Sequence, residues 1–223
     1  MKQAPKVPEV RIYFSWQLYD NVSVPLLKGT ENSSWLETKD KQLEYAANYR
    51  SEWSKYSEPI LSALVDSLKI RFYRSVIDAP CTPGVIPFSD PLTLNFAYYP
   101  NQFVDIMLHE LCHIILTDNT VYPIHSSEQR IVISERWIKL FGNEFTRNTL
   151  VHIPVHALSK YIYLDVLQEP ERLERDVKNL EHLPDYKAAW DYVNTHDYRT
   201  IIEQLKNDYK ALADELRDGK IQA

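Results

Sequence analysis

The chain has 223 residues, of which 44% are hydrophobic, and a formal net charge of −6. This length suits one domain or one and a half, and the apolar fraction is large enough for a proper core. The acidic balance argues against nucleic-acid binding, because such proteins normally present a basic face. We also expect no membrane span, since the sequence has no window of about 20 uncharged apolar residues.

Cysteine content and the N-terminal residues bear on location. The two cysteines, Cys81 and Cys112, do not make a disulfide framework. Residues 1–8 lack the apolar core of a signal peptide. We therefore expect a cytoplasmic protein with reduced thiols. The four glycines are too scattered to form a glycine-rich phosphate loop.

The first part of the chain is expected to hold the strands and one long helix. Runs of β-branched and aromatic residues predict three strands, at 9–16, 68–77 and 91–99. A helical pattern extends from about Lys39 to Leu68, and Pro59 is expected to break or kink that helix. The stretches 17–38 and 78–90 are expected to be irregular.

The segment after the third strand carries the motif His109-Glu110-Leu111-Cys112-His113, which reads H-E-x-x-H. On a helix, residues i and i+4 share one face, so His109 and His113 can bind one metal ion. Glu110 is rotated by about 100° from His109 and can reach a water held by the metal, as a general base does. This spacing is that of a zinc hydrolase site, and we predict bound Zn²⁺.

The surroundings of the motif favour a buried helix. Asn101 is a good N-cap, and Asp105 falls near the first turn, where negative charge is favoured. Asp118 and Asn119 end the helical run. Apolar residues recur at helical spacing, namely Phe103, Ile106, Met107, Ile114 and Ile115. The alternative is an ordinary helix with two core or surface histidines beside a surface glutamate.

Beyond Thr120 the sequence is expected to be helical to its end. Five helices are predicted, at Ser126–Phe141, Ile153–Leu167, Glu169–Leu180, Tyr186–Thr195 and Tyr198–Arg217. Strands first and helices later indicate an α+β fold, in which a small N-terminal sheet packs on the motif helix. We predict a sheet and active-site helix subdomain at 1–120, and a helical subdomain at 121–223 that completes the metal site.

A zinc hydrolase usually has three protein ligands and one open position for water. Two ligands come from the motif helix, so a third must come from elsewhere in the chain. The downstream candidates are His125, Glu128 and Glu135. Glu128 and Glu135 share one helical face, which also fits a charged, solvated stripe.

The motif followed by a glutamate on a later helix resembles the gluzincin group of zinc metallopeptidases, the thermolysin-like branch of the zincins. Residues 133–142 are similar to the gluzincin helix that carries the third ligand, which implies that Glu135 binds the metal. Four positions on, where gluzincins have an acidic residue that braces a histidine ligand, this chain has Lys139. The resemblance covers about residues 101–142, and only the five-residue motif in it is specific.

Two further histidines, His152 and His156, stand among apolar residues around Pro154. Pro154 fits the first turn of a helix, and buried histidines need partners. Either histidine is a candidate catalytic residue that donates a hydrogen bond to the oxyanion, as a downstream histidine or tyrosine does in gluzincins. Tyr161 and Tyr163 are further candidates, and histidines bonded to backbone or carboxylate are the alternative.

The leading hypothesis is a single-zinc metallopeptidase that acts on a peptide or protein substrate. By resemblance to zincins, the substrate would extend along strand 92–98. A second hypothesis is a catalytically inactive zincin-fold module, whose structural metal site serves protein binding or regulation. A closed site would favour it, for example one with ligands His109, His113, His125 and Glu128. A third is a narrow regulatory protease acting on one partner.

Overall fold

A computed structural model describes residues 7–95 and 102–221 of the chain. It has a mostly helical α+β fold, with a small sheet near the N-terminus and a helical C-terminal part. The chain divides into two compact units, formed by residues 1–58 with 74–111 and by residues 59–73 with 112–223. Two helices, α3 (Lys39–Leu68) and α4 (Phe103–Thr117), belong to both units. The expected division after residue 120 stays a prediction.

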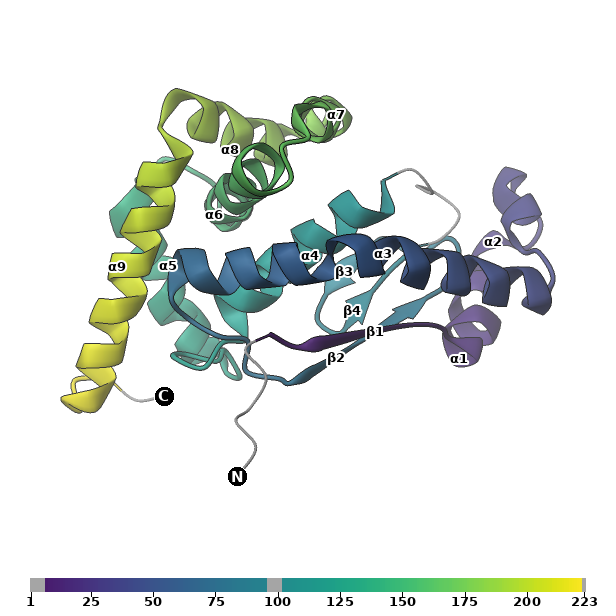
Figure 1. The fold of residues 1–223 in the computed structure, drawn as a ribbon, viewed down its shortest axis with the longest axis horizontal. Helices are drawn as coiled ribbons and strands as arrows, with labels where there is room; N and C mark the ends of the chain where they lie inside the picture. Colours follow the sequence, from purple (N-terminus) through teal and green to yellow (C-terminus); the bar gives the residue numbers. More distant parts are fainter. Residues whose placement is uncertain (1–6, 96–101, 222–223) are drawn as a thin grey trace. The chain divides into compact units, whose positions relative to one another are not determined.

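The first unit is built on a parallel pair of strands, β1 (Glu9–Phe14) and β2 (Val76–Cys81). Glu9 pairs with Val76 and Phe14 with Cys81. A parallel pair needs a crossover connection, and α3 lies within that connection (Figure 1). The predicted N-terminal strand is confirmed, although it ends two residues before Trp16.

A short hairpin forms a second two-stranded sheet. Strands β3 (Phe88–Ser89) and β4 (Leu92–Thr93) pair antiparallel, and Leu94 bridges to Cys81. The predicted strand at 91–99 is therefore much shorter, and residues 96–101 lie outside the described part. The strand predicted at 68–77 was wrong in position. Lys69 adopts a left-handed conformation (φ 56°) directly after α3, so the chain turns there and its strand begins only at Val76.

Helices occupy more of the N-terminal region than the sequence pattern indicated. Residues 17–38 were expected to be irregular, but residues 16–35 hold four short helical segments: α1 (Trp16–Leu18), η1 (Tyr19–Ser23), α2 (Val24–Leu27) and η2 (Glu31–Trp35). Helix α3 also continues through Pro59 instead of breaking there. A proline inside a helix costs about 3 kcal/mol, and burial of Ile60 and Leu64 alone offsets that cost at about 1.5–3 kcal/mol each.

The second unit packs its helices around α6 (Arg147–Tyr161). It contains α5 (Ser127–Phe141), η3 (Ile162–Val166), α7 (Pro170–Leu180), α8 (Pro184–Thr195) and α9 (Tyr198–Arg217). Helix α6 contacts α5, α8 and α9, and residues 152–159 are all buried (Figure 1). It begins six residues earlier than predicted, because Thr146 caps its N-terminus by accepting from the Thr149 backbone N–H. Pro154 therefore lies inside the helix, not in its first turn.

Side-chain contacts fix the helices of the second unit. Arg136 of α5 pairs with Asp208 and Glu215 of α9, each at 2.9 Å. The Tyr209 hydroxyl donates to the Leu116 carbonyl of α4 at 2.5 Å.

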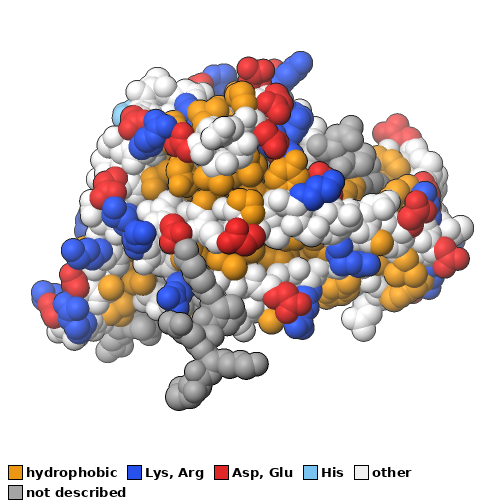
Figure 2. All heavy atoms as spheres, in the orientation of Figure 1, with side chains coloured by type: hydrophobic (Ala, Val, Ile, Leu, Met, Phe, Trp, Pro, Cys, Tyr) orange, Lys and Arg blue, Asp and Glu red, His pale blue; other side chains and the backbone are white. Residues whose placement is uncertain are grey.

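The face drawn in Figure 2 shows acidic and basic side chains interspersed around apolar patches. Within the described residues, none of the helices has the length and apolar character needed to cross a membrane.

Candidate metal centre

Helix α4 presents the two motif histidines on one side. Leu108, Leu111 and Cys112 are fully buried, whereas His109 and His113 are half-buried one turn apart. Tyr49 of α3 stacks on Phe103, the first residue of α4, with ring centroids 4.1 Å apart. The predicted motif helix is confirmed, although its expected cap at residue 101 lies outside the described part.

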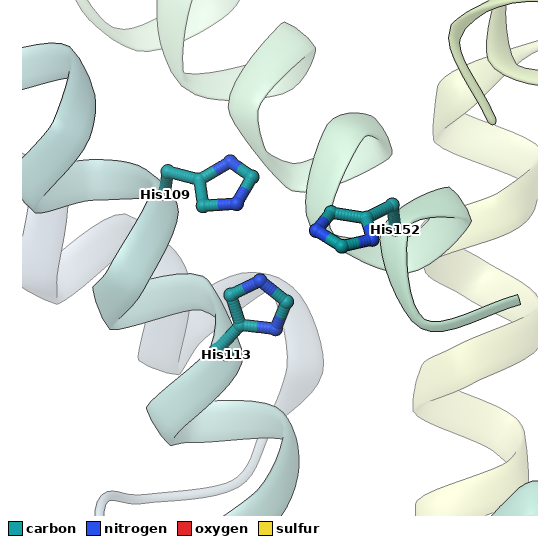
Figure 3. Close-up of side chains that lie close together, drawn as sticks. All are labelled: His109, His113 and His152. Atoms are coloured by element: carbon teal, nitrogen blue, oxygen red, sulfur yellow. The ribbon is translucent and has the colours of Figure 1, made fainter. Parts of the chain in front are cut away.

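A third histidine, His152 of α6, completes a cluster with the motif pair. One ligand atom from each of His109, His113 and His152 lies within 4.8 Å of the other two. Figure 3 shows the three imidazoles turned toward a common space, two from α4 and one from α6. The α4 helix itself holds His109 in place relative to His113, and His113 belongs to the same unit as His152. Among described residues, this is the group whose donor atoms can hold a metal ion.

The donor set suits a transition-metal ion, of which zinc is one. Zinc binds histidine nitrogen at about 2.0–2.1 Å, so two nitrogens on one tetrahedral ion lie roughly 3.4 Å apart. In the structure the three ligand atoms lie within 4.8 Å of one another, so they would have to move closer together to bind one ion. Imidazole nitrogens suit Zn²⁺ and other transition-metal ions better than Mg²⁺ or Ca²⁺, which prefer oxygen ligands.

The hydrogen bonding of His152 fixes which of its nitrogens can bind a metal. Its Nδ1 lies 2.8 Å from the backbone carbonyl oxygen of Asn148. A carbonyl oxygen only accepts, so Nδ1 must carry the proton and donate it. In the neutral ring the lone pair is then on Nε2, which is the arrangement of a histidine ligand held by a backbone carbonyl.

Burial keeps two of these imidazoles neutral. It lowers the pKa of His113 to about 3, with a smaller contribution from the neighbouring His152. It also lowers the pKa of His152, against opposing contributions from the Asn148 carbonyl and Asp185. Because a histidine must be deprotonated to bind a metal, both rings are ready to do so at neutral pH.

Glu110 lies next to His109 on the buried part of α4. Only 7% of its surface is exposed, and this burial raises its pKa from about 4.5 to about 8. The metal-free carboxyl group is therefore mostly protonated at neutral pH. A nearby cation favours the charged form, so metal binding would return Glu110 toward the carboxylate that a general base requires.

A layer of rings from α6 and α8 packs behind His152. Tyr186 of α8 lies against the His152 ring with centroids 3.9 Å apart. His156, one turn further along α6, stacks on Trp190 with centroids 4.2 Å apart and an interplanar angle of 10°. His156 is buried and is not a member of the three-histidine group. The predicted roles of His152 and His156 as oxyanion donors stay predictions.

The three expected candidates for the third ligand lie outside the cluster. Glu135, Glu128 and His125 are all exposed, and His125 packs edge-on against Tyr73. Helix α5 buries a stripe at Ile133, Trp137 and Phe141, which directs Glu135 to the opposite, solvated side. Metal binding by Glu135 stays a prediction, and the geometry favours His152 in its place.

Sequence reasoning singled out His152 but gave it another role. A ligand that comes from a separate helix has no fixed spacing from the motif, so local patterns could not identify it. The available signal was a histidine among apolar residues, which needs a compensating partner when buried. Tyr161 and Tyr163 were further candidates for the oxyanion donor. Tyr163 is fully buried and Tyr161 is half-buried.

No family model matches the sequence, and no curated protein or solved structure matches it either. Likeness to a known family therefore rests on the motif at residues 109–113 alone. The residues that indicate a function are then the three histidines and Glu110.

Proposed function

We propose that this chain is a zinc-dependent metallohydrolase, and specifically a peptidase, with His109, His113 and His152 as the metal ligands. The observation that carries the proposal is the convergence of three imidazole ligand atoms within 4.8 Å. Three protein ligands leave a fourth position for water, which is typical of catalytic zinc, whereas structural zinc usually has four protein ligands.

The motif assigns Glu110 the proton-transfer role in this proposal. A zinc ion at the cluster would polarise the substrate carbonyl and lower the pKa of water. Glu110 would accept a proton from the attacking water and deliver it to the leaving amine nitrogen. Amide hydrolysis needs both steps, because hydroxide is scarce at neutral pH and an unprotonated amine leaves poorly.

The proposed ligand set differs from that of the gluzincins, which use two histidines and a glutamate. With His152 and not Glu135 as the third ligand, all three protein ligands are neutral. The charge of the metal ion is then not reduced by an anionic ligand. Such a site attracts electrons from a bound carbonyl more strongly. The zincin-like fold and the peptide substrate are part of the proposal, and the motif supports both.

The test combines metal content with hydrolysis. Protein purified without chelator is analysed by metal mass spectrometry and assayed on a quenched-fluorescent peptide library. Variants are Glu110→Gln, His152→Ala and, as a control on an exposed carboxylate, Glu135→Gln. We expect about one zinc per chain in wild type, Glu110→Gln and Glu135→Gln, a sharp reduction in His152→Ala, and loss of hydrolysis in Glu110→Gln.

Other outcomes separate the alternatives. Zinc bound by wild type without hydrolysis of any peptide would indicate the non-catalytic module with a structural metal site. Loss of zinc in Glu135→Gln, with zinc retained in His152→Ala, would restore the gluzincin ligand set. No zinc in wild type would overturn the proposal.

A further inference from the structure

The start of helix α6 is tied to helix α8 through one carboxylate. Asp185, in the first turn of α8, accepts from the Thr146 hydroxyl at 2.6 Å and from the Thr149 hydroxyl at 3.2 Å. It also accepts from the Asn148 side-chain amide at 3.1 Å. These three donors are the N-cap and two first-turn residues of α6, so Asp185 holds the whole beginning of that helix.

Asn148 connects this carboxylate to the proposed metal ligand. Its side-chain amide donates to Asp185, while its backbone carbonyl accepts the proton of His152 Nδ1 at 2.8 Å. The position of that carbonyl therefore sets both the orientation of the His152 ring and the nitrogen that keeps the lone pair. A shift of the first turn of α6 would change both.

The next residue of α8 acts on the same ring. Tyr186 packs against His152 with centroids 3.9 Å apart and an interplanar angle of 39°. Consecutive residues of α8 thus limit the imidazole in two ways, one through the carbonyl at its Nδ1 and one through its face. The negative charge of Asp185 at the N-terminus of α6 is also favoured by the helix dipole.

We infer that Asp185 is a positioning residue, which holds Asn148 so that its carbonyl orients His152 as the third metal ligand. This inference rests on the proposed function, because it takes His152 to be a ligand. It extends that function by placing part of the metal site on α8, far from the motif in sequence. Asp185 itself is not one of the three candidate ligands.

The principal test measures zinc affinity in competition with a chromophoric chelator. Asp185→Asn keeps the size of the side chain but replaces one carboxylate oxygen by an amide NH₂ group. This group is itself a donor, so it cannot accept the hydrogen bonds that the carboxylate accepts from α6. We expect zinc affinity about 10–100-fold weaker than wild type, as is typical when the partner of a metal-binding histidine is lost. Asp191→Asn is the matched control, since Asp191 is an exposed carboxylate on α8 that pairs with Lys187.

Two further variants separate positioning from general stability. Asn148→Ala keeps the backbone carbonyl and the Thr146 cap but removes the link to Asp185, so we expect weakened binding in a folded protein. Asp185→Glu keeps the carboxylate and should recover part of the affinity lost in Asp185→Asn. Thermal unfolding of each metal-free variant shows whether the affinity changes occur without a loss of folding.

A spectroscopic measurement tests the inference without metal. The ¹⁵N shifts of His152 in the metal-free protein report its tautomer, and we expect a single Nδ1–H form in wild type and a mixture in Asp185→Asn. Zinc affinity within twofold of wild type together with an unchanged tautomer in Asp185→Asn would overturn the inference. If wild type binds no zinc, the proposed function fails, while the tautomer measurement still decides whether Asp185 positions His152.

Discussion

Burial of Glu110 is expected to destabilise the metal-free protein in a pH-dependent way. The pKa of its carboxyl group is about 8 in the folded chain, against about 4.5 without burial. Folding therefore favours the protonated form. Below pH 4.5 the carboxyl group is protonated in both the folded and the unfolded chain and does not change the free energy of unfolding, whereas above pH 4.5 it lowers that free energy progressively. At pH 7 the gap of about 2.5 pH units corresponds to about 3 kcal/mol.

The substitution that tests this reasoning is Glu110→Gln, which removes the titration and keeps the shape. At pH 7 we expect the metal-free variant to be more stable than wild type by about 3 kcal/mol. For a chain of this length that corresponds to a rise in Tm of about 6–12 °C. At pH 4 both side chains are neutral, and the two proteins should unfold within about 1 kcal/mol of each other.

The assay is thermal unfolding with a chelator present, followed by fluorescence across pH 4–8. Glu135→Gln serves as the control, because that glutamate is exposed on α5 and its removal should leave the pH dependence unchanged. Added zinc should narrow the gap between wild type and Glu110→Gln, since a nearby cation stabilises the carboxylate. If wild type and Glu110→Gln had the same Tm at pH 7 as well as at pH 4, the assignment of Glu110 to a desolvated position would be refuted.

Three other substitutions test the packing around the site. Tyr209→Phe removes the hydrogen bond to the Leu116 carbonyl and should lower the free energy of unfolding by about 1–2 kcal/mol in a urea titration, with zinc content unchanged. Arg136→Ala leaves two facing carboxylates without their cation and should cost about 2–4 kcal/mol in the same titration, more at low than at high salt. His156→Ala loses the stack on Trp190 and should lower the Tm, while zinc affinity stays within a few-fold of wild type, because His156 is not in the ligand group. A loss of zinc comparable to that of His152→Ala would contradict this last expectation.

Local sequence patterns predicted helices α5 and α9 and the motif helix closely. The bounds of α9 match the prediction, and those of α5 differ by one residue, because both helices carry clear apolar periodicity and side-chain caps at Ser126 and Asp197. The motif helix was also predictable, since i and i+4 spacing is a property of the helix itself. The predicted α+β class is confirmed by the small sheet near the N-terminus together with the helical C-terminal part.

Tertiary relations were less accessible. Strand β2 was predicted too early in the chain. The residues around Phe72 have the composition of a strand, but they form an irregular segment in which Phe72 makes only an isolated bridge to Asn119. The start of α6 was missed because Pro154 fits the first turn of a helix, whereas burial on all sides holds it mid-helix. Glu135 lies on the side of α5 opposite the buried stripe of Ile133, Trp137 and Phe141, in agreement with the solvated charged face that was the alternative to a ligand position.

Burial also sets the charge states of the side chains at the candidate metal site. His113 and His152 have lowered pKa values and Glu110 has a raised one, so all three side chains are uncharged in the metal-free protein at neutral pH. An uncharged cluster can be buried at modest cost, whereas its ionised form could not. Protons also compete weakly for the imidazole nitrogens, which leaves their lone pairs available to a dication. The metal then supplies the positive charge that stabilises the Glu110 carboxylate, so in this arrangement metal binding and activation of the general base are one coupled event.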